Sequence, residues 1–192
     1  MSLSGGAQIH TQNRLFEHIS DFVKVKNIFP DLPLDSKILD AGCGDARLSQ
    51  KLVEMGFQVT GLDINEEGLK SAKAKGLNTI LGDIEQTWQT EDKSFDLVMM
   101  LDVLEHITNM EGVLAQVKRV LKPDGFFLVV FPNHFDLRNR INMLFGGGIV
   151  HWDHKKYPNT RAWNYGHVRF LKLRELQEFM SLSGLGVNKI QK

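Results

Sequence analysis

The sequence predicts an α/β fold, namely a doubly wound, mostly parallel sheet with helices on both faces. Between positions 37 and 131, short apolar runs alternate with amphipathic stretches of about ten residues. The runs are apolar at successive positions, which is typical of strands buried on both faces. This alternation indicates βαβ units, whose right-handed crossovers make a doubly wound sheet the simplest topology.

The first part of this pattern contains three strands and two helices. The apolar run Lys37–Asp40 is followed by a predicted helix at Ala46–Met55. The second strand, Gln58–Asp63, leads into a helix at Glu66–Lys75, and the third strand is Thr79–Leu81. A glycine follows each helix, where the chain must leave the helical conformation.

The second part continues the same alternation. The run "FDLVMML" predicts a fourth strand at Phe95–Leu101, before a helix at Met110–Leu121. The segment "KPDG" is typical of a turn, and "FFLVVF" predicts a fifth strand at Phe126–Phe131. We therefore expect residues 37–131 to form the core that binds a ligand.

The ends of the chain are expected to complete a single domain, residues 1–192. Residues 1–11 are interpreted as a flexible leader, and residues 12–36 as an N-terminal lid helix with a linker. The pattern is lost over residues 132–170, which we interpret as an insertion that forms a lid or the substrate site. Residues 171–192 predict a helix at Leu173–Ser183 and one further strand. Sheets of this kind often end in a hairpin, which leaves open whether the last strand is lacking.

Composition excludes several classes of protein. Lys and Arg total 23, as do Asp and Glu, so no overall charge favours nucleic acid or an anionic membrane. No apolar run approaches the roughly 18 residues that span a bilayer. The single cysteine, Cys43, excludes an internal disulfide and fits a reducing compartment. We expect a cytoplasmic protein without nucleic-acid partners or integral membrane contact, whose oligomeric state is open.

The segment "ILDAGCGDARL" has the pattern of a nucleotide-cofactor turn. Gly42 permits a tight turn after the first strand, and Gly44 lets the backbone approach a ligand. A dinucleotide fingerprint would need a third glycine at position 47, which is Arg47, so NAD is disfavoured. Ala46 allows the alternative G-x-G-x-G spacing. No Gly-Lys-Ser/Thr follows, which excludes a P-loop.

Acidic residues lie at the ends of three successive predicted strands. These are Asp40, Asp63 and Asp83. A carboxylate at the second position can accept both ribose hydroxyls, and one beside Ile84 can bind an adenine amino group. Three acids suit an adenosyl cofactor with a cationic head better than a pyrophosphate. The combination indicates S-adenosylmethionine.

Five segments resemble, in order and spacing, the motifs of the class I S-adenosylmethionine-dependent methyltransferases. They are "ILDAGCGDARL", "VTGLDIN", "LGDIE", "FDLVMMLDVLEHI" and "VLKPDGFFLVVFPN", within residues 37–133. The resemblance implies a Rossmann-like fold and a methyltransferase that converts S-adenosylmethionine to S-adenosylhomocysteine. Ala46 departs from the family's usual third glycine. The segments "FPNHFDLRNRINMLF" and "GHVRFLKLRELQEF" are similar to the MetW-like branch and to related small-molecule O-methyltransferases.

The resemblance also implies which residues bind the cofactor. The glycine turn holds the methionyl end, the second acid takes the ribose hydroxyls, and the third acid and its isoleucine hold the adenine. Leu101 and Asp102, at the end of the fourth strand, lie under the methionyl amino group. The N-terminal helix covers the pocket, with Arg14 as a candidate for the cofactor carboxylate. The implied cofactor-binding residues are Asp40, Ala41, Gly42, Cys43, Gly44, Asp63, Ile64, Asp83, Ile84, Leu101 and Asp102.

The acceptor site is expected beyond the fourth strand and in the insertion. Glu105 and His106 either support the helix that follows or line the methyl-transfer pocket. The segment "HWDH" lacks the spacing and partners of a metal site, so we predict no metal. A histidine general base and a plain polar loop remain alternatives. The amphipathic stretch from Arg138 to Phe145 is a lid helix, a membrane-surface contact or a partner surface. The candidate acceptor-site residues are His106, Asn133, Arg138, Tyr165 and His167.

The leading hypothesis is in-line methyl transfer from S-adenosylmethionine to a small-molecule acceptor of unknown identity. No catalytic residue is assigned, because a sulfonium methyl group is already activated and needs mainly positioning. The alternative is a cofactor-binding, non-catalytic partner that regulates a biosynthetic enzyme, as the MetW-like resemblance suggests. An NAD-dependent oxidoreductase is disfavoured by Arg47.

Overall fold

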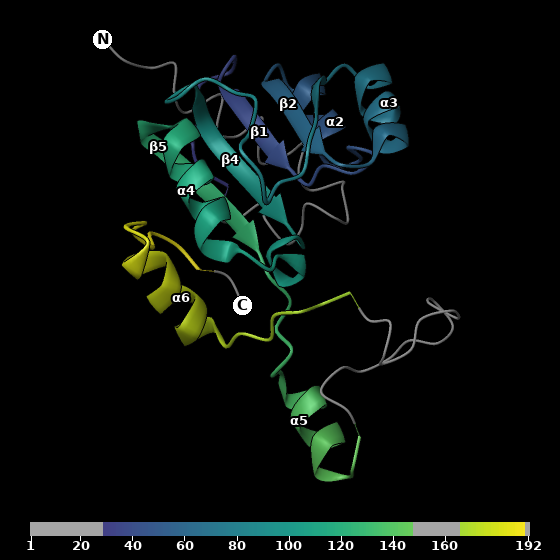
Figure 1. The fold of residues 1–192 in the computed structure, drawn as a ribbon, viewed down its shortest axis with the longest axis vertical. Helices are drawn as coiled ribbons and strands as arrows, with labels where there is room; N and C mark the ends of the chain where they lie inside the picture. The colour runs from purple at the N-terminus through teal and green to yellow at the C-terminus, as the bar shows by residue number, and fades with distance from the viewer. Residues whose placement is uncertain (1–28, 148–165, 191–192) are drawn as a thin grey trace.

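The computed structural model describes residues 29–147 and 166–190, and its centre is a five-stranded sheet in the order β3-β2-β1-β4-β5 (Figure 1). Every pairing between these strands is parallel, so the predicted doubly wound sheet is confirmed. The chain moves outward from β1 to β3 and then crosses to β4, which makes the β1–β4 boundary the topological switch point. The strands are β1 Lys37–Ala41, β2 Gln58–Asp63, β3 Asn78–Leu81, β4 Phe95–Leu101 and β5 Leu121–Val130.

Helices occupy the crossovers and the segment after β5. Three of them begin at a residue whose side chain accepts a backbone N–H of the first turn: Asn65 before α3, Asn109 before α4 and Asp136 before α5. A short 3-10 turn, η2, lies between β4 and α4. The bounds are α2 Ser49–Glu54, α3 Glu66–Ala74, η2 Leu104–His106, α4 Met110–Val120, α5 Leu137–Leu144 and α6 Leu173–Leu182.

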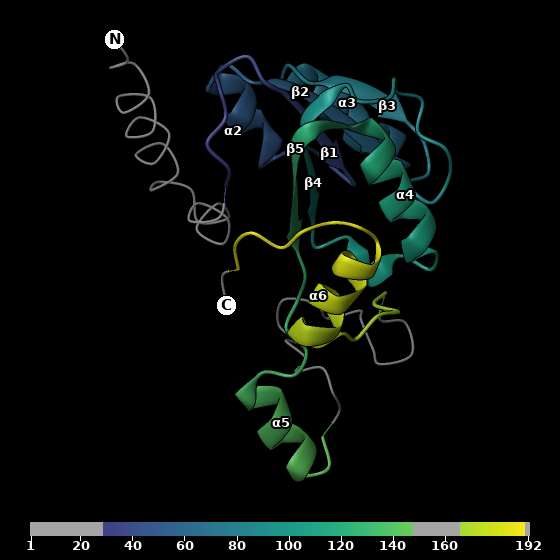
Figure 2. The ribbon, with the colours of Figure 1, turned by 90° about the vertical axis from the view of Figure 1, so that its left-hand side faces the viewer.

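The sheet has an apolar cluster on each face, as predicted. Alternate strand residues point to opposite faces, so Ile38 and Leu39 of β1 belong to different clusters. Leu52 of α2 lies in one cluster, and Val113 of α4 and Met180 of α6 lie in the other. Figure 2 shows the sheet close to edge-on, with α2 and α4 on opposite sides. Burial on both faces explains why the strands are apolar at successive positions.

The fifth strand begins earlier than predicted. Leu121 pairs with Phe95, while Phe126 pairs with Leu97, so the expected turn "KPDG" is accommodated as an irregularity within β5. A local bulge of this kind adds residues to one strand without ending its pairing. The sequence does contain a turn signal, but the residues before and after "KPDG" both pair with β4, so the strand continues through it.

The predicted additional strand in the tail is wrong. Residues 185–190 form no strand, and Gly184 adopts φ +75° at the end of α6. Gly184, Gly186 and Asn188 give residues 184–190 a low strand propensity. The predicted N-terminal helix at Gln12–Ile28 and its candidate Arg14 lie outside the described residues.

The predicted amphipathic segment after β5 is helical. Its helix α5 lies apart from the sheet in both views, below α6 (Figures 1 and 2). Within residues 29–147 and 166–190, none of the helices is long and apolar enough to cross a membrane.

Candidate functional site

The three predicted acids meet at the carboxyl edge of the sheet. Asp40 pairs in register with Gly61, and Asp63 pairs with Leu81. Asp83 follows β3 after one intervening residue. Because parallel strands end at the same edge, three positions distant in sequence lie along one edge of the sheet, with Asp40 beside the switch point and Asp83 farthest from it.

The glycine turn after β1 requires residues without a side chain for two different reasons. Gly42 adopts φ +83°, and a Cβ there would lie 2.6 Å from Cγ2 of Val103. Gly44 adopts φ +53°, and a Cβ there would meet no atom within 4 Å. The first glycine therefore permits packing on the segment after β4. The second leaves open space where a ligand can approach the backbone.

Asp63 fixes this turn from the neighbouring strand. Its Oδ2 accepts the N–H of Gly44 at 2.8 Å, and its Oδ1 accepts the N–H of Asn65 at 2.8 Å. A carboxylate oxygen can accept more than one hydrogen bond. Both oxygens therefore retain acceptor capacity for a pair of hydroxyl groups, as the sequence predicts for a ribose.

Asp40 is a buried carboxyl group at the base of the turn. It is 5% exposed, and Ser49 Oγ donates a hydrogen bond to its Oδ2 at 2.5 Å. Burial raises the pKa of Asp40 from 3.8 to about 6, against the lowering effect of Ser49, and the charge of Asp63 raises it further. A cationic group that binds here would offset this cost of ionisation.

A cavity of about 230 Å³ opens beside the turn. Its lining includes Arg47, which pairs with Asp45 at 3.0 Å and is exposed. In the sequence, Arg47 served only to exclude NAD, and Asp45 and Leu48 were not predicted as site residues. Their position directly after a tight turn is the one sequence feature that could have indicated that they line a cavity. The lining residues are Asp40, Gly42, Cys43, Asp45, Arg47, Leu48 and Leu101.

Cys43 lines the cavity as a protonated thiol. Burial raises its pKa from 9.0 to about 12, with further contributions from the nearby charges of Asp40 and Asp63. The thiolate form that acts as a nucleophile is therefore strongly disfavoured. This agrees with its interpretation as a small residue of the turn.

Two neighbouring positions carry backbone strain. Ala46, which replaces the usual third glycine, adopts φ +57° and is 1% exposed. Asp102 adopts φ +54° directly after β4, and its N–H donates to the carbonyl of Val130. Left-handed conformations are costly for residues other than glycine, and such strain concentrates at functional sites.

The predicted adenine-binding pair lies at the far side of this edge. Asp83 is exposed, and its Oδ1 accepts the N–H of Glu85 at 2.9 Å. Ile84 packs on the apolar cluster of the α4 face, and its carbonyl accepts the indole N–H of Trp88 at 2.9 Å. Ile64, by contrast, is 72% exposed.

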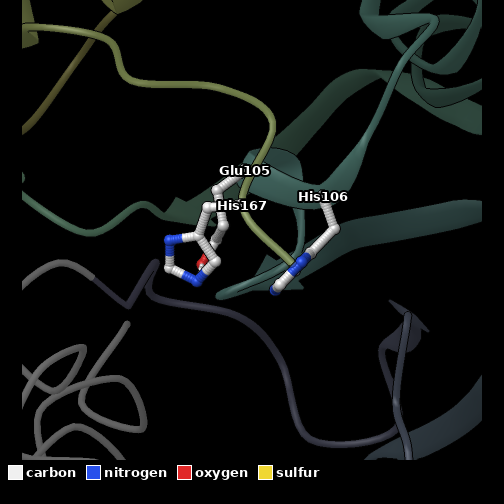
Figure 3. A group of neighbouring side chains, drawn as sticks. All are labelled: Glu105, His106 and His167. Carbon is white, nitrogen blue, oxygen red and sulfur yellow. Dashed lines mark ion pairs between the residues drawn. The ribbon is translucent and has the colours of Figure 1, made fainter. Parts of the chain in front are cut away.

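A second polar group lies just beyond β4, in the turn η2 (Figure 3). Glu105 is 1% exposed, and its Oε1 lies 3.9 Å from Nε2 of His167. The ring of His106 meets that of His167 edge to face, with centroids 4.7 Å apart. His134 Nε2 lies 2.7 Å from His167 Nδ1. The fold thus joins two predicted acceptor-site residues, His106 and His167, with Glu105 and the buried His134.

The other predicted acceptor-site residues are not part of this group. Asn133 is exposed and accepts the N–H of Phe135 through Oδ1 at 3.2 Å. Arg138 is exposed on α5. Tyr165 lies outside the described residues.

The histidine group also presents potential metal ligands. Ligand atoms of Glu105, His106 and His167 all lie within 4.8 Å of one another. Ligands of one zinc ion lie about 3.4 Å apart, since each is about 2.1 Å from the metal. The 3.9 Å separation from Glu105 Oε1 to His167 Nε2 is wider than that. The prediction that no metal is used stays a prediction.

The residues at the carboxyl edge fit an adenosyl cofactor with a cationic head. Gly44 leaves space over its Cα, and Asp63 presents two oxygens beside it. Asp40 is a buried acid that a positive group would stabilise in its charged form.

Comparisons with known proteins agree with this geometry. Residues 39–129 match the family model described as "Methyltransferase domain". The chain is 31% identical over 159 residues to a ubiquinone biosynthesis O-methyltransferase of Idiomarina loihiensis, covering 78% of this chain and 61% of that protein. It is 25% identical over 174 residues to the Rickettsia bellii protein of the same name, covering 88% and 68%. The chain thus spans about two thirds of the length of these relatives.

Solved structures show the same fold. A methyltransferase from Thermotoga maritima aligns with a TM-score of 0.65 at 19% identity, covering 93% of this chain and 76% of that chain. An S-adenosylmethionine-dependent methyltransferase from Methanosarcina mazei aligns with a TM-score of 0.58 at 25% identity, covering 79% and 80%.

Proposed function

The chain belongs to the class I S-adenosylmethionine-dependent methyltransferases, and on that premise we propose that it methylates a hydroxyl group of a small aromatic acceptor. The observation that carries this proposal is a cavity at the switch point that Asp40 and Gly42 line, beside a turn whose Gly44 donates its N–H to Asp63. Membership of the family supports an enzyme over a non-catalytic binding partner.

The residues named at the carboxyl edge are each proposed to bind one part of the cofactor. The turn from Asp40 to Gly44 binds the methionyl end, and Arg47 pairs with its carboxylate. Asp63 accepts the ribose hydroxyls, while Asp83 and Ile84 hold the adenine. The open space at Gly44 and the two oxygens of Asp63 support these roles.

The names of the relatives support the proposed acceptor class. Several are ubiquinone biosynthesis O-methyltransferases, which indicates a hydroxylated ring as the acceptor. Residues 132–170 are proposed to shape the acceptor site as part of a single domain. In support, His134 and His167, near the two ends of that segment, contact each other beside η2.

The cofactor supplies a methyl group activated by positive sulfur. The chain therefore has to orient the acceptor in line and keep water out. The buried acid Asp40 favours the charged head, and the turn fixes the direction from which an acceptor can approach.

Binding and transfer assays test the proposal. S-adenosylhomocysteine should bind the wild-type protein in calorimetry, and labelled S-adenosylmethionine should transfer its methyl group to catechol. Asp63→Asn should weaken binding at least about tenfold, since a hydrogen bond to a charged group contributes roughly 1.5–3 kcal/mol. Glu66→Gln, at an exposed acid on the neighbouring α3, is the matched control and should bind normally. Absence of binding to the wild-type protein would contradict the assignment of the site.

A further inference from the structure

A second cavity, of about 350 Å³, opens at the edge of the sheet opposite to the cofactor turn. Its lining includes the first residue of each of β1, β2, β3 and β4, which lie at the amino ends of these parallel strands. Its volume falls within the range of about 300–1,000 Å³ that is usual for small-molecule sites. The cavity is therefore large enough for a ligand, and it lies away from the carboxyl edge where the methyl donor is proposed to bind.

The cavity exists because the connection from β3 to β4 contains no helix. Residues 82–94, all of which the structure describes, form turns and bends only. Gln58 and Thr60 of β2 point to the same face as Leu62, which belongs to the apolar cluster of the α4 face. A helix that packs on a sheet needs apolar residues beneath it, so these polar residues leave the amino half of this face open.

One wall of the cavity is held in place from α4. The guanidinium of Arg119 donates to the carbonyls of Trp88 and Thr90 at 2.9 and 2.8 Å, and it pairs with Asp92 at 2.7 Å. Trp88 is 2% exposed, and its indole N–H donates to a backbone carbonyl of the same connection. The part of the connection that lines the cavity is therefore fixed before any ligand binds, as is usual for small-molecule sites.

The polar side chains of the lining have unused hydrogen-bonding capacity. Four of these side chains make no hydrogen bond with any described residue: Gln58, Thr60, Asn78 and Gln89. Carboxamides and hydroxyls each both donate and accept hydrogen bonds. They therefore match a ligand that is rich in hydroxyl groups, since these also donate and accept.

The charges of the lining cancel. Lys37 contributes one positive group and Glu91 one negative group, and no ion pair joins them. The lining thus has no excess of positive charge to bind a phosphate or a carboxylate group. Ile80 and Phe95 add apolar surface, against which the C–H groups of a ring can pack. A neutral ring compound with several hydroxyl groups satisfies all of these features.

We propose that this cavity is a second binding site, and that its ligand is a neutral sugar the size of a mono- or disaccharide. The sugar hydroxyls bond to the carboxamides of Gln58 and Asn78 and to the hydroxyl of Thr60. The C–H face of the ring packs on Ile80. The site lies at the opposite edge of the sheet from Asp63, so it does not depend on the proposed methyl transfer.

Titration of the nitrogen-labelled full chain, followed by amide NMR signals, tests the site. The probes are D-glucose, D-galactose, N-acetyl-D-glucosamine and maltose. At least one should bind with a dissociation constant of about 2 mM or lower, which is the ligand efficiency usual for molecules of this size. The amide signals of Thr60, Asn78 and Gln89 should shift, whereas those of Gly44 and Asn65 at the cofactor turn should not.

Variants of the lining test whether its polar groups recognise the sugar. Thr60→Val keeps the shape of the side chain and removes its hydroxyl, and Asn78→Ala removes a carboxamide. The double variant should bind the sugar about tenfold more weakly, since each lost hydrogen bond accounts for a change of a few-fold. Gln86→Ala, at an exposed position of the same connection but outside the cavity, is the matched control and should bind as the wild-type protein does. Urea unfolding should give the same midpoint for each variant as for wild type, which shows that each is folded.

The outcomes separate this site from the proposed function. The sugar site is overturned if none of the four probes shifts the signals of the cavity, or if the shifts occur at Gly44 and Asn65 instead. It is also overturned if the folded double variant binds as tightly as wild type. A protein that binds a sugar in this cavity but does not bind S-adenosylhomocysteine would contradict only the proposed function.

Discussion

At the residue scale, the site depends on one acid, Asp40, placed where its charge is costly. Asp40 is buried beneath the glycine turn and lies close enough to Asp63 for their charges to interact. Ser49 supplies only part of the compensation. Such an arrangement reduces stability in the absence of a ligand and favours a cationic ligand when one binds.

Asp40→Asn should therefore stabilise the unliganded protein in a pH-dependent way. The folded-state pKa of about 6 lies above the ordinary value of 3.8, so ionisation costs stability as the pH rises from about 4 to about 6. The difference of about two units corresponds to about 3 kcal/mol, fully present above pH 6 and absent below pH 4. Urea unfolding across this range, compared with wild type, measures the effect. The same variant should bind S-adenosylhomocysteine more weakly, and a stability gain that does not change with pH would contradict the explanation.

At the element scale, helix α3 supports the cofactor turn from behind. A Cβ on Gly68 would lie 2.8 Å from the carbonyl oxygen of Gly44, which is backbone and cannot move aside freely. Asn65 begins the helix and also donates its N–H to Asp63. The start of α3 and the turn after β1 thus form one unit around that carboxylate.

Gly68→Ala should disturb this unit without touching the ligand. Helix propensity alone would make alanine more stable by about 1 kcal/mol, yet the close contact should destabilise the protein by about 1–3 kcal/mol. Affinity for S-adenosylhomocysteine should fall with it, because Gly44 is displaced. Lys73→Ala, at an exposed position of the same helix, is the control and should leave binding unchanged. A stabilised Gly68→Ala variant with normal affinity would show that the turn has room to adjust.

At the scale of the whole molecule, the segment after the insertion returns to the core. Met180 of α6 is 5% exposed within the cluster that includes α4, whereas Leu182 of the same helix is 82% exposed. The hydrogen bonds from Val168 and Arg169 to the carbonyl of Glu105 bring the start of this segment to η2. The C-terminal helix therefore contributes to the same hydrophobic core as the sheet.

Met180→Ala should cost about 2–5 kcal/mol of unfolding free energy, as for other large-to-small changes in a core. Leu182→Ala should change it by no more than about 0.5 kcal/mol. Chemical unfolding of the two variants beside the wild-type protein measures the difference. Similar effects at both positions would mean that α6 does not pack on the sheet in solution.

The alternation of strands and helices could be predicted because it depends on local chemistry. A strand buried on both faces must be apolar at successive positions, and β2 and β4 begin and end at the predicted residues. The acids Asp40, Asp63 and Asp83 could be placed at one edge because parallel topology brings strand ends together. Helix ends were less accurate, since α2 begins at Ser49, three residues later than predicted.

By itself, the sequence therefore determined the parallel sheet, the glycine turn and the adenosyl cofactor. Each depends on residues that are close together in the sequence or on motifs that follow one another in a fixed order. Only the tertiary structure showed which histidines lie together beside the turn η2. His106, His134 and His167 are far apart along the chain, and no periodicity relates them. Their meeting with Glu105 depends on the path of the chain after β5 and back to η2, where burial lowers the pKa values of His134 and His167. The predicted tail strand was wrong because residues 184–190 have a low strand propensity and find no pairing strand among the described residues.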